Sequence, residues 1–273
     1  MSTKNQQLPN LNNLSVLVAM ILLAYTLTHF VSLPALEIEL RFLGIYLPIR
    51  LNFTLLVSLL VTGLVASGTA WLLREHPVIE YEQHTIEHWL LPGLTSLVLM
   101  LVIEQIPFSV QWWVVTAFSG LLLTLVLMAE YIAVDPDNEY YPFAEIGITT
   151  LSMSFFLILA IALHAEEVRL FFRVPLLSFT AGLVFLRILH LRLKGRWVFL
   201  PALVTVLCIG QLSAGLHYWP MSSISFGIAL LGPLYAMIEI GERHSREEST
   251  SIVQLLMFPG FVILLSWLAA FLL

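Results

Sequence analysis

The sequence predicts an all-α integral membrane protein with about nine transmembrane helices. The first observation is composition: 59% of the 273 residues are hydrophobic and only 11% are charged, whereas a soluble domain carries about a quarter charged residues. The second is a mean hydropathy of +0.92. The third is that apolar runs of about 20 residues, the length that crosses a bilayer core, recur along the whole chain.

Each predicted helix follows one of these runs. The spans cover residues 14–33, 51–73, 89–107, 110–133, 145–164, 171–190, 197–217, 222–241 and 252–273. The runs are continuous, which favours helices over membrane-spanning strands that alternate over about ten residues. No soluble domain interrupts them, so residues 1–273 are expected to form a single polytopic membrane domain.

One segment, residues 35–53, has a different pattern. Apolar and charged residues alternate before Gly44, with Ile38 between Glu37 and Glu39, and apolar residues recur at every second position after it. Period-two alternation around a glycine predicts a short β-hairpin. An isolated hairpin is marginally stable in water, so it is expected to pack on the helix bundle or on lipid at the extracytoplasmic side. An amphipathic loop of no fixed form is the alternative.

Two stretches 109 residues apart end a long apolar run in the same way. The motif Met-x-Glu closes both, at Glu130 and at Glu239, and Pro92 aligns with Pro201 at the same offset. The pattern predicts a four-helix internal repeat, and the repeat is parallel because equivalent helices lie an even number of spans apart. Chance similarity between apolar sequences is the alternative.

The two half-repeats are predicted at residues 14–144 and 145–273. Binding sites in repeated membrane proteins tend to lie at the repeat interface. If the repeat is real, replacing either of the two symmetric glutamates is expected to have a similar effect.

Positive charges favour a cytoplasmic N-terminus and an extracytoplasmic C-terminus. On this topology the cytoplasmic cations are Lys4, Arg74, Arg192, Lys194, Arg196, Arg243 and Arg246. The extracytoplasmic ones are Arg41, Arg50, Arg169 and Arg173. The first apolar run is longer than the core of a cleaved signal peptide and fits a signal anchor. The favoured location is the plasma (inner) membrane.

The densest cluster of chemically active side chains lies in "ALHAEEVRLFFRVPL", residues 162–176. His164, Glu166 and Glu167 follow the fifth predicted span. Paired carboxylates beside an imidazole can hold a metal or divide the general acid and base roles, which makes these three the candidate catalytic residues. The alternative is a solvated turn with a local ion pair, because Glu166 and Arg169 share a helix face.

The same stretch carries two family resemblances. "EEVRLFFR" resembles the Glu-Glu…Phe-Arg signature of the intramembrane proteases that process prenylated proteins, although Arg173 follows Glu167 by six residues where that family has four. It also looks like the Glu-Glu…Phe-Phe segment of the small membrane-embedded lycopene cyclases, with one residue more. Each resemblance covers less than a tenth of the chain. Both imply an intramembrane enzyme.

A second cluster precedes the third predicted span. His84 and His88 are four residues apart, a spacing that places two imidazoles on one helical face toward a metal. An amphipathic cytoplasmic helix is the alternative. The single Cys208 permits no internal disulfide and indicates no cysteine-based metal site. No basic stripe indicates nucleic acid, and no motif identifies a cofactor.

Four ionisable residues in or near the spans are candidate ligand-binding groups: Glu104, Glu130, Glu239 and Arg187. Ionisable groups in a bilayer usually face a partner or a cavity. Long side chains near a membrane edge can instead extend to the headgroups. The small residues of "GLVASG", 63–68, are expected to allow close helix packing.

Three function classes follow. The favoured one is a carrier, transporter or binding protein for a small hydrophobic or lipid-like ligand at the interface of the half-repeats. The second is an intramembrane enzyme acting on a lipid or isoprenoid through His164, Glu166 and Glu167. The third is a non-catalytic scaffold subunit that binds partner membrane proteins. The lipid bilayer is an expected partner in all three.

Overall fold

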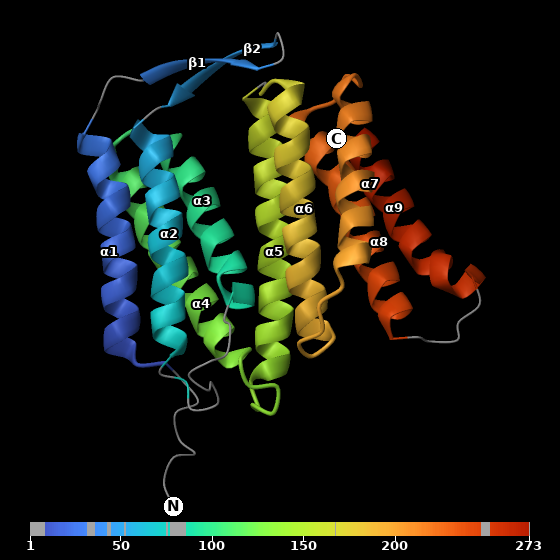
Figure 1. Cartoon of the computed structure of the whole chain (residues 1–273), viewed down its shortest axis with the longest axis horizontal. Helices are drawn as coiled ribbons and strands as arrows, with labels where there is room; N and C mark the ends of the chain where they lie inside the picture. Colours follow the sequence, from blue (N-terminus) through green and yellow to red (C-terminus); the bar gives the residue numbers. More distant parts are fainter. Residues whose placement is uncertain are drawn as a thin grey trace, which may run out of the picture. The chain divides into compact units, whose positions relative to one another are not determined.

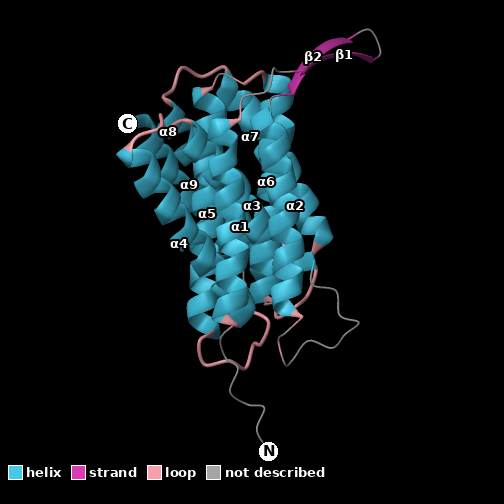
Figure 2. Ribbon diagram, turned by 90° about the vertical axis from the view of Figure 1, so that its left-hand side faces the viewer, coloured by secondary structure: helices cyan, strands magenta, loops and turns pink. Residues whose placement is uncertain are grey.

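The computed structural model describes residues 9–31, 36–42, 45–51, 53–74, 76, 86–166, 168–246 and 252–272. Helices account for most of this part of the chain, as Figure 2 shows. The chain divides into two compact units, Met1–Asn138 (unit 1) and Glu139–Leu273 (unit 2). Each unit has its own ring of packed helices.

Unit 1 is built from four long helices and three short elements. They are α1 (Leu11–Phe30), β1 (Leu36–Phe42), β2 (Ile45–Leu51), α2 (Phe53–Leu73), the 3₁₀ turn η1 (Ile86–His88), α3 (Leu90–Glu104) and α4 (Val110–Ile132). Helices α1 to α4, blue to green in Figure 1, pack in a ring in which each contacts the next and α4 returns to α1. The hydroxyl of Tyr25 on α1 donates to the carbonyl of Ser96 on α3 at 2.7 Å. A buried polar bond of this kind fixes how two apolar helices face each other.

Unit 2 repeats the same neighbour pattern with one helix more. Its elements are α5 (Tyr141–Ala165), α6 (Leu170–Arg192), α7 (Phe199–His217), α8 (Ser223–Ser245) and α9 (Ile252–Leu272). Helices α5 to α8 form a ring in which each contacts the next and α8 returns to α5, while α9 packs on α8. The indole N–H of Trp267 on α9 donates to the carbonyl of Ala229 on α8 at 3.2 Å.

Local sequence explains where the helices of unit 2 begin and end. Ser222 caps α8, because its hydroxyl accepts the backbone N–H of Ser225 at 3.1 Å. At the end of α6, Gly195 has φ +92° and its N–H donates to the carbonyl of His190 at 2.8 Å. Glycine adopts this left-handed conformation without a steric cost, so it stops the helix. Arg192 is thereby left on the last turn of α6.

Seven helices among the described residues are long and apolar enough to cross a membrane, so the protein is a multi-pass integral membrane protein. The predicted count of about nine spans is therefore wrong. Helix α3 has 15 residues, about 22 Å of helix, which is short for a bilayer core of about 30 Å. The segment is apolar all the same, and apolarity alone does not set helix length. Helix α9 has 21 residues, of which Leu256–Leu272 form a shorter apolar stretch.

The predicted fold class needs a second correction, at residues 35–53. Every membrane-spanning candidate in the described chain is a helix, so β structure is no part of the membrane-spanning architecture. Strands β1 and β2 form an antiparallel pair of their own, with Leu36 opposite Leu51 and Phe42 opposite Ile45. Neither strand packs extensively on a described helix. Of the two partners expected for this segment, the helix bundle or lipid, the bundle is therefore not the one that the structure shows.

Candidate functional site

Unit 1 contains a buried polar pair near the ends of α2 and α4. Glu130, on the last turns of α4, is fully buried, and its Oε2 lies 2.8 Å from Nδ1 of His88 in η1, which is also buried. A carboxylate only accepts hydrogen bonds, so Nδ1–H of the imidazole is the donor. Burying a charge is costly unless it is paired and hydrogen-bonded. The pair therefore supplies the partner that a carboxylate at this depth needs.

A second histidine lies beside this pair. His76, just beyond α2, is buried, and its ring meets Tyr131 of α4 edge to face with centroids 4.6 Å apart. Burial lowers the pKa of His76, the negative charge of Asp135 acts in the opposite direction, and His88 lowers the pKa further. The imidazole is therefore more readily kept neutral than a histidine in water. We call His76, His88, Glu130 and Tyr131 the His88–Glu130 corner.

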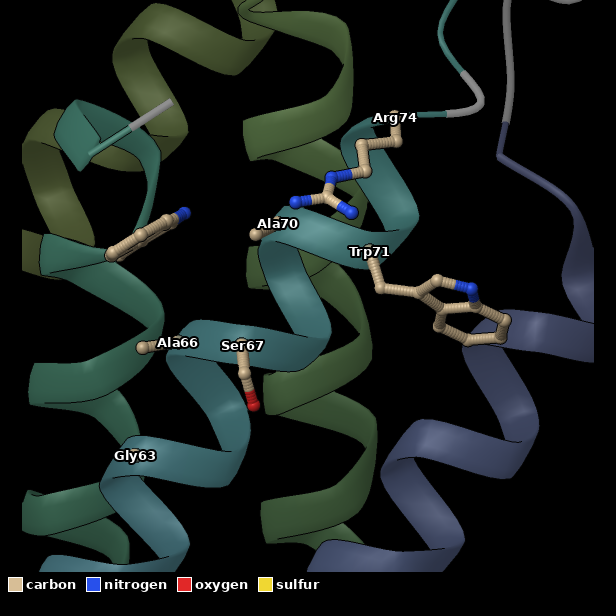
Figure 3. A pocket seen from close by; sticks show the side chains of 7 residues that line it. Gly63, Ala66, Ser67, Ala70, Trp71 and Arg74 are labelled. Atoms are coloured by element: carbon tan, nitrogen blue, oxygen red, sulfur yellow. The ribbon is translucent and has the colours of Figure 1, made fainter. Parts of the chain in front are cut away.

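An open groove of about 460 Å³ runs along α2 next to this corner. Its lining consists of Gly63, Ala66, Ser67, Ala70, Trp71, Arg74 and Trp89. Four of these are small residues spaced by three or four positions, which places them on one helix face. In Figure 3 the Arg74 side chain folds back along α2 over Ala70, with Ser67 farther along the helix.

Two polar groups of the groove have no partner in the part of the chain that the structure describes. The indole Nε1 of Trp89 is buried and has no hydrogen-bond acceptor there. The guanidinium of Arg74 is exposed and forms no ion pair with any described residue. Both groups are donors only, and the arginine carries a full positive charge. The groove therefore combines an apolar floor with a cationic, donor-rich end.

The small residues of 63–68 serve two purposes. A side chain at Gly68 would collide with Leu17 of α1, so this glycine allows close helix packing as predicted. At Gly63 an added Cβ meets nothing within 4 Å. Gly63 therefore opens the groove, a consequence that the spacing of small residues did not distinguish from packing.

Unit 2 contains an arginine held by two histidines. Arg173, on the first turn of α6, is 1% exposed. Its Nη1 lies 2.8 Å from Nδ1 of His164 at the end of α5, and its Nη2 contacts Nδ1 of His217 at the end of α7. The guanidinium carbon is 5.1 Å from the centre of the Phe226 ring on α8, on which His164 also stacks. We call these four residues the Arg173 cluster.

The other ends of α6 and α8 are joined by ion pairs. Arg192 contacts Glu242 at 2.7 Å and Glu239 at 3.6 Å. Arg243 pairs with Glu239 at 3.1 Å, and Arg246 pairs with Glu242 at 2.7 Å. We call these five residues the Arg192–Glu242 corner. All the carboxylates here have cationic partners, so the corner is a structural clamp between two helices.

The predicted ligand-binding residues have different surroundings. Glu130 and Glu239 occupy the two corners just described. Glu104 is exposed at the end of α3. Arg187 is buried on α6 and interacts electrostatically with Tyr141 of α5. The role of these four residues in ligand binding stays a prediction.

The predicted catalytic and metal residues are only partly described. Glu167 and His84 lie outside the described residues. Glu166 is exposed at the end of α5, and His164 belongs to the Arg173 cluster. Within the described ranges no three His, Cys, Asp or Glu side chains are grouped as a metal ion would require. The metal and catalytic assignments stay predictions.

Neither the grouping of Arg173 with His217 nor the role of Trp89 as a hydrogen-bond donor in the groove was predicted from the sequence. One signal was available for the first. His164 and His217 both end predicted spans on the same side, and Arg173 begins one there. Residues at span ends on one side of a membrane can meet, but which of them do so depends on helix packing.

A family model described as "Protein of unknown function (DUF5656)" matches residues 33–273 of the chain. The match covers well over half of the chain, so the chain belongs to this family. No curated protein and no solved structure matches it.

Proposed function

We propose that this member of the DUF5656 family is a membrane carrier or binding protein for a lipid-like amphiphile with an acidic headgroup. The ligand occupies the groove along α2 in unit 1. The observation that carries the proposal is that two donors lie at one end of a groove lined mainly by small and apolar residues. They are Arg74, which has no ion pair among the described residues, and the indole N–H of Trp89, which has no acceptor among them.

The polar end of the groove indicates that the headgroup of the ligand is acidic. An arginine guanidinium and an indole N–H donate hydrogen bonds and accept none. Arginine is well suited to phosphate and carboxylate because its planar fork donates two parallel hydrogen bonds. A buried donor without an acceptor costs free energy, so an oxyanion that accepts from Trp89 removes a cost that the free protein bears.

The remaining part of the groove indicates that the ligand has an apolar tail. Gly63, Ala66 and Ala70 present almost no side chain, and α2 is a membrane-spanning candidate. A volume of about 460 Å³ falls within the range of small-molecule sites, about 300–1,000 Å³. An acyl or isoprenoid chain lying along α2 would fill this surface while its headgroup stays near the helix end.

Two further features are part of the proposal. We propose that the halves are related by a parallel duplication, supported by the matching rings α1–α4 and α5–α8. We also propose that the protein lies in the plasma (inner) membrane with a cytoplasmic N-terminus, supported by its positive charges. Reporter fusions at the two termini test the orientation, and an N-terminal reporter active only outside the cell contradicts it.

The enzyme alternative has less support than the carrier. It assigns catalysis to His164, Glu166 and Glu167, but Nδ1 of His164 accepts a hydrogen bond from Arg173 and is not available as a base. The scaffold alternative has no specific observation in its favour, because exposed apolar side chains are expected on any membrane-facing helix.

The test is to fill the groove without disturbing the fold. Gly63→Leu adds a side chain where an added Cβ meets nothing within 4 Å, and leucine favours the helix over glycine by about 0.5–1 kcal/mol. Gly147→Leu is the matched control, since Gly147 also has open space but lies on α5 in unit 2. Native mass spectrometry of the full chain with dioleoyl phosphatidylglycerol counts the lipids retained.

We expect Gly63→Leu to retain one lipid fewer than the wild type and Gly147→Leu to retain the same number. Trp89→Phe, which keeps a ring but removes the N–H, and Arg74→Gln are each expected to weaken retention about tenfold. Equal retention by Gly63→Leu and the wild type would show that the groove is not the site.

A further inference from the structure

We propose that the Arg173 cluster is a second anion site, which binds the phosphate of an anionic phospholipid at the membrane edge of unit 2. The proposal is independent of the groove in unit 1, because it rests on different residues in a different unit. It assigns a ligand to His164 and His217 that is neither a metal nor a substrate undergoing reaction.

The first argument is charge. Arg173 is almost completely buried, yet no carboxylate among the described residues pairs with it. Arg192, Arg243 and Arg246 in the same unit each have a carboxylate partner. A buried cation is costly unless it is neutralised and hydrogen-bonded. The contacts to two imidazoles and to the Phe226 ring supply hydrogen bonds and polarisable surface but no negative charge.

The second argument is the protonation pattern of the cluster. Guanidinium groups only donate hydrogen bonds, so Nδ1 of His164 and Nδ1 of His217 are both acceptors and both rings are neutral. Each ring then carries its proton on Nε2. The His164 Nε2–H is directed at the carbonyl of Met221 at 3.4 Å, a long contact. His217 is half-buried, and no described residue accepts a hydrogen bond from its Nε2–H.

The third argument is the unused capacity of the arginine itself. Nε of Arg173 is buried and has no hydrogen-bond partner. Of the five N–H donors of a guanidinium, the two imidazoles occupy two. The remaining donors, together with the His217 Nε2–H, are matched by the several acceptor oxygens of a phosphate. An oxyanion is the group that satisfies the charge and the donors together.

The position of the cluster selects a lipid as the source of that oxyanion. His164 is the second-last residue of α5, His217 is the last of α7, and Arg173 and Phe226 lie on the first turns of α6 and α8. All four helices are membrane-spanning candidates. Residues at the ends of spanning helices lie at the depth of lipid headgroups, where basic residues contact anionic lipids.

The test uses the full chain in mild detergent with dioleoyl phosphatidylglycerol and, separately, with dioleoyl phosphatidylcholine or inorganic phosphate. Arg173→Gln is expected to weaken phosphatidylglycerol binding about tenfold or more, the usual loss when a charged hydrogen-bond partner is removed. Arg169→Gln is the matched control, an exposed arginine one turn earlier, and should bind like the wild type. Thermal melting and native mass spectrometry report the binding.

A second variant tests the proposal in case Arg173→Gln does not fold. His217→Phe keeps a ring at a half-buried position and leaves the arginine in place, and it is expected to weaken binding several-fold. Equal loss of binding in Arg169→Gln and in Arg173→Gln would show that the lipid responds to positive charge near the start of α6 in general and would overturn the proposal. Inorganic phosphate that stabilises the protein as strongly as phosphatidylglycerol would overturn the assignment to a lipid, as would equal binding of phosphatidylcholine.

The two lipid sites are separable in one experiment. The double variant Gly63→Leu with Arg173→Gln is expected to lose both lipids, and each single variant is expected to lose one. If Gly63→Leu retains every lipid while Arg173→Gln loses one, the proposal for the groove fails and the proposal for the Arg173 cluster stands.

Discussion

The two glutamates that the sequence alignment treats as equivalent lie in very different surroundings. Glu130 in unit 1 is fully buried and pairs with a histidine 42 residues earlier in the chain. Glu239 in unit 2 is partly exposed and lies between Arg192 and Arg243. Near the end of α4, the glutamate of the Met-x-Glu motif therefore forms a hydrogen-bonded polar pair. Near the end of α8, the glutamate of the same motif forms ion pairs.

This difference extends to the arginine at the end of the second helix in each ring. In unit 2 the last turn of the ring's second helix, α6, carries Arg192, which the α8 carboxylates neutralise. In unit 1 the second helix is α2, and Arg74 follows its last turn. The α4 carboxylate there pairs with His88 instead, and Arg74 forms no ion pair with any described residue. Two helix rings with the same order of neighbours thus end their second helices differently, one in a clamp and one at an open groove.

Replacing each glutamate in turn is the most direct test of the difference between their surroundings. Glu130→Ala leaves His88 without its buried partner and is expected to cost about 3 kcal/mol. Glu239→Ala is expected to cost only about 1 kcal/mol, because its side chain is partly exposed and Arg192 keeps Glu242. Thermal melting in detergent measures both. Equal losses would favour the symmetric response that the repeat alone predicts.

The coupling free energy between Arg192 and Glu242 in unit 2 is measured by a double-mutant cycle. Their side chains are 17% and 16% exposed, so water screens the pair only in part. We expect a coupling of about 1 kcal/mol. The cycle consists of Arg192→Gln, Glu242→Gln and the double variant, and zero coupling would mean that the corner is not a clamp.

The His88–Glu130 corner is expected to respond to pH through His76. The folded-state pKa of His76 lies below its ordinary value of 6.5, so the unfolded chain binds the extra proton more readily. Stability should therefore be level above about pH 6.5 and fall as the pH is lowered from there toward the folded-state pKa. His76→Phe keeps a ring against Tyr131 and should reduce the loss of stability at low pH. Melting temperatures at about pH 8 and about pH 5.5 measure the difference, and parallel curves for the two proteins would contradict it.

The smallest expected effect concerns Arg243. It pairs with Glu239 one helical turn earlier, and its side chain is 26% exposed. Pairs of this kind contribute about 0.3–0.5 kcal/mol. Arg243→Gln should therefore lower the melting temperature only slightly, and less so in high salt. A loss as large as that of Arg192→Gln would show that the two arginines share the clamp equally.

Much of the helix pattern was predictable from the sequence. The predicted span 110–133 corresponds to α4 (Val110–Ile132), and 197–217 corresponds to α7 (Phe199–His217). An apolar run must satisfy its backbone hydrogen bonds internally in a bilayer, so it folds as a helix whatever its neighbours are. The short α3 is where this reasoning failed, because the predicted span continues to residue 107 whereas the helix ends at Glu104.

The candidate sites were much less predictable. His88 was identified for its spacing to His84 and Glu130 for its place in a repeat, but nothing in the sequence indicated that they pair. The same holds for Arg173, whose partners lie 9 and 44 residues away. Periodicity reports which face of one helix a residue occupies, whereas a pair between helices also depends on their rotation and relative depth.

By itself, then, the sequence determined the membrane class, the position of most helices and the residue types available at their ends. Those properties depend on local composition and on the cost of exposing backbone groups to lipid. Tertiary structure alone decided that Glu130 meets an imidazole while Glu239 meets arginines, and that Gly63 opens a groove while Gly68 closes a helix contact. These outcomes depend on side-chain packing across helices, where shifts of one residue along a helix rotate a side chain by about 100°.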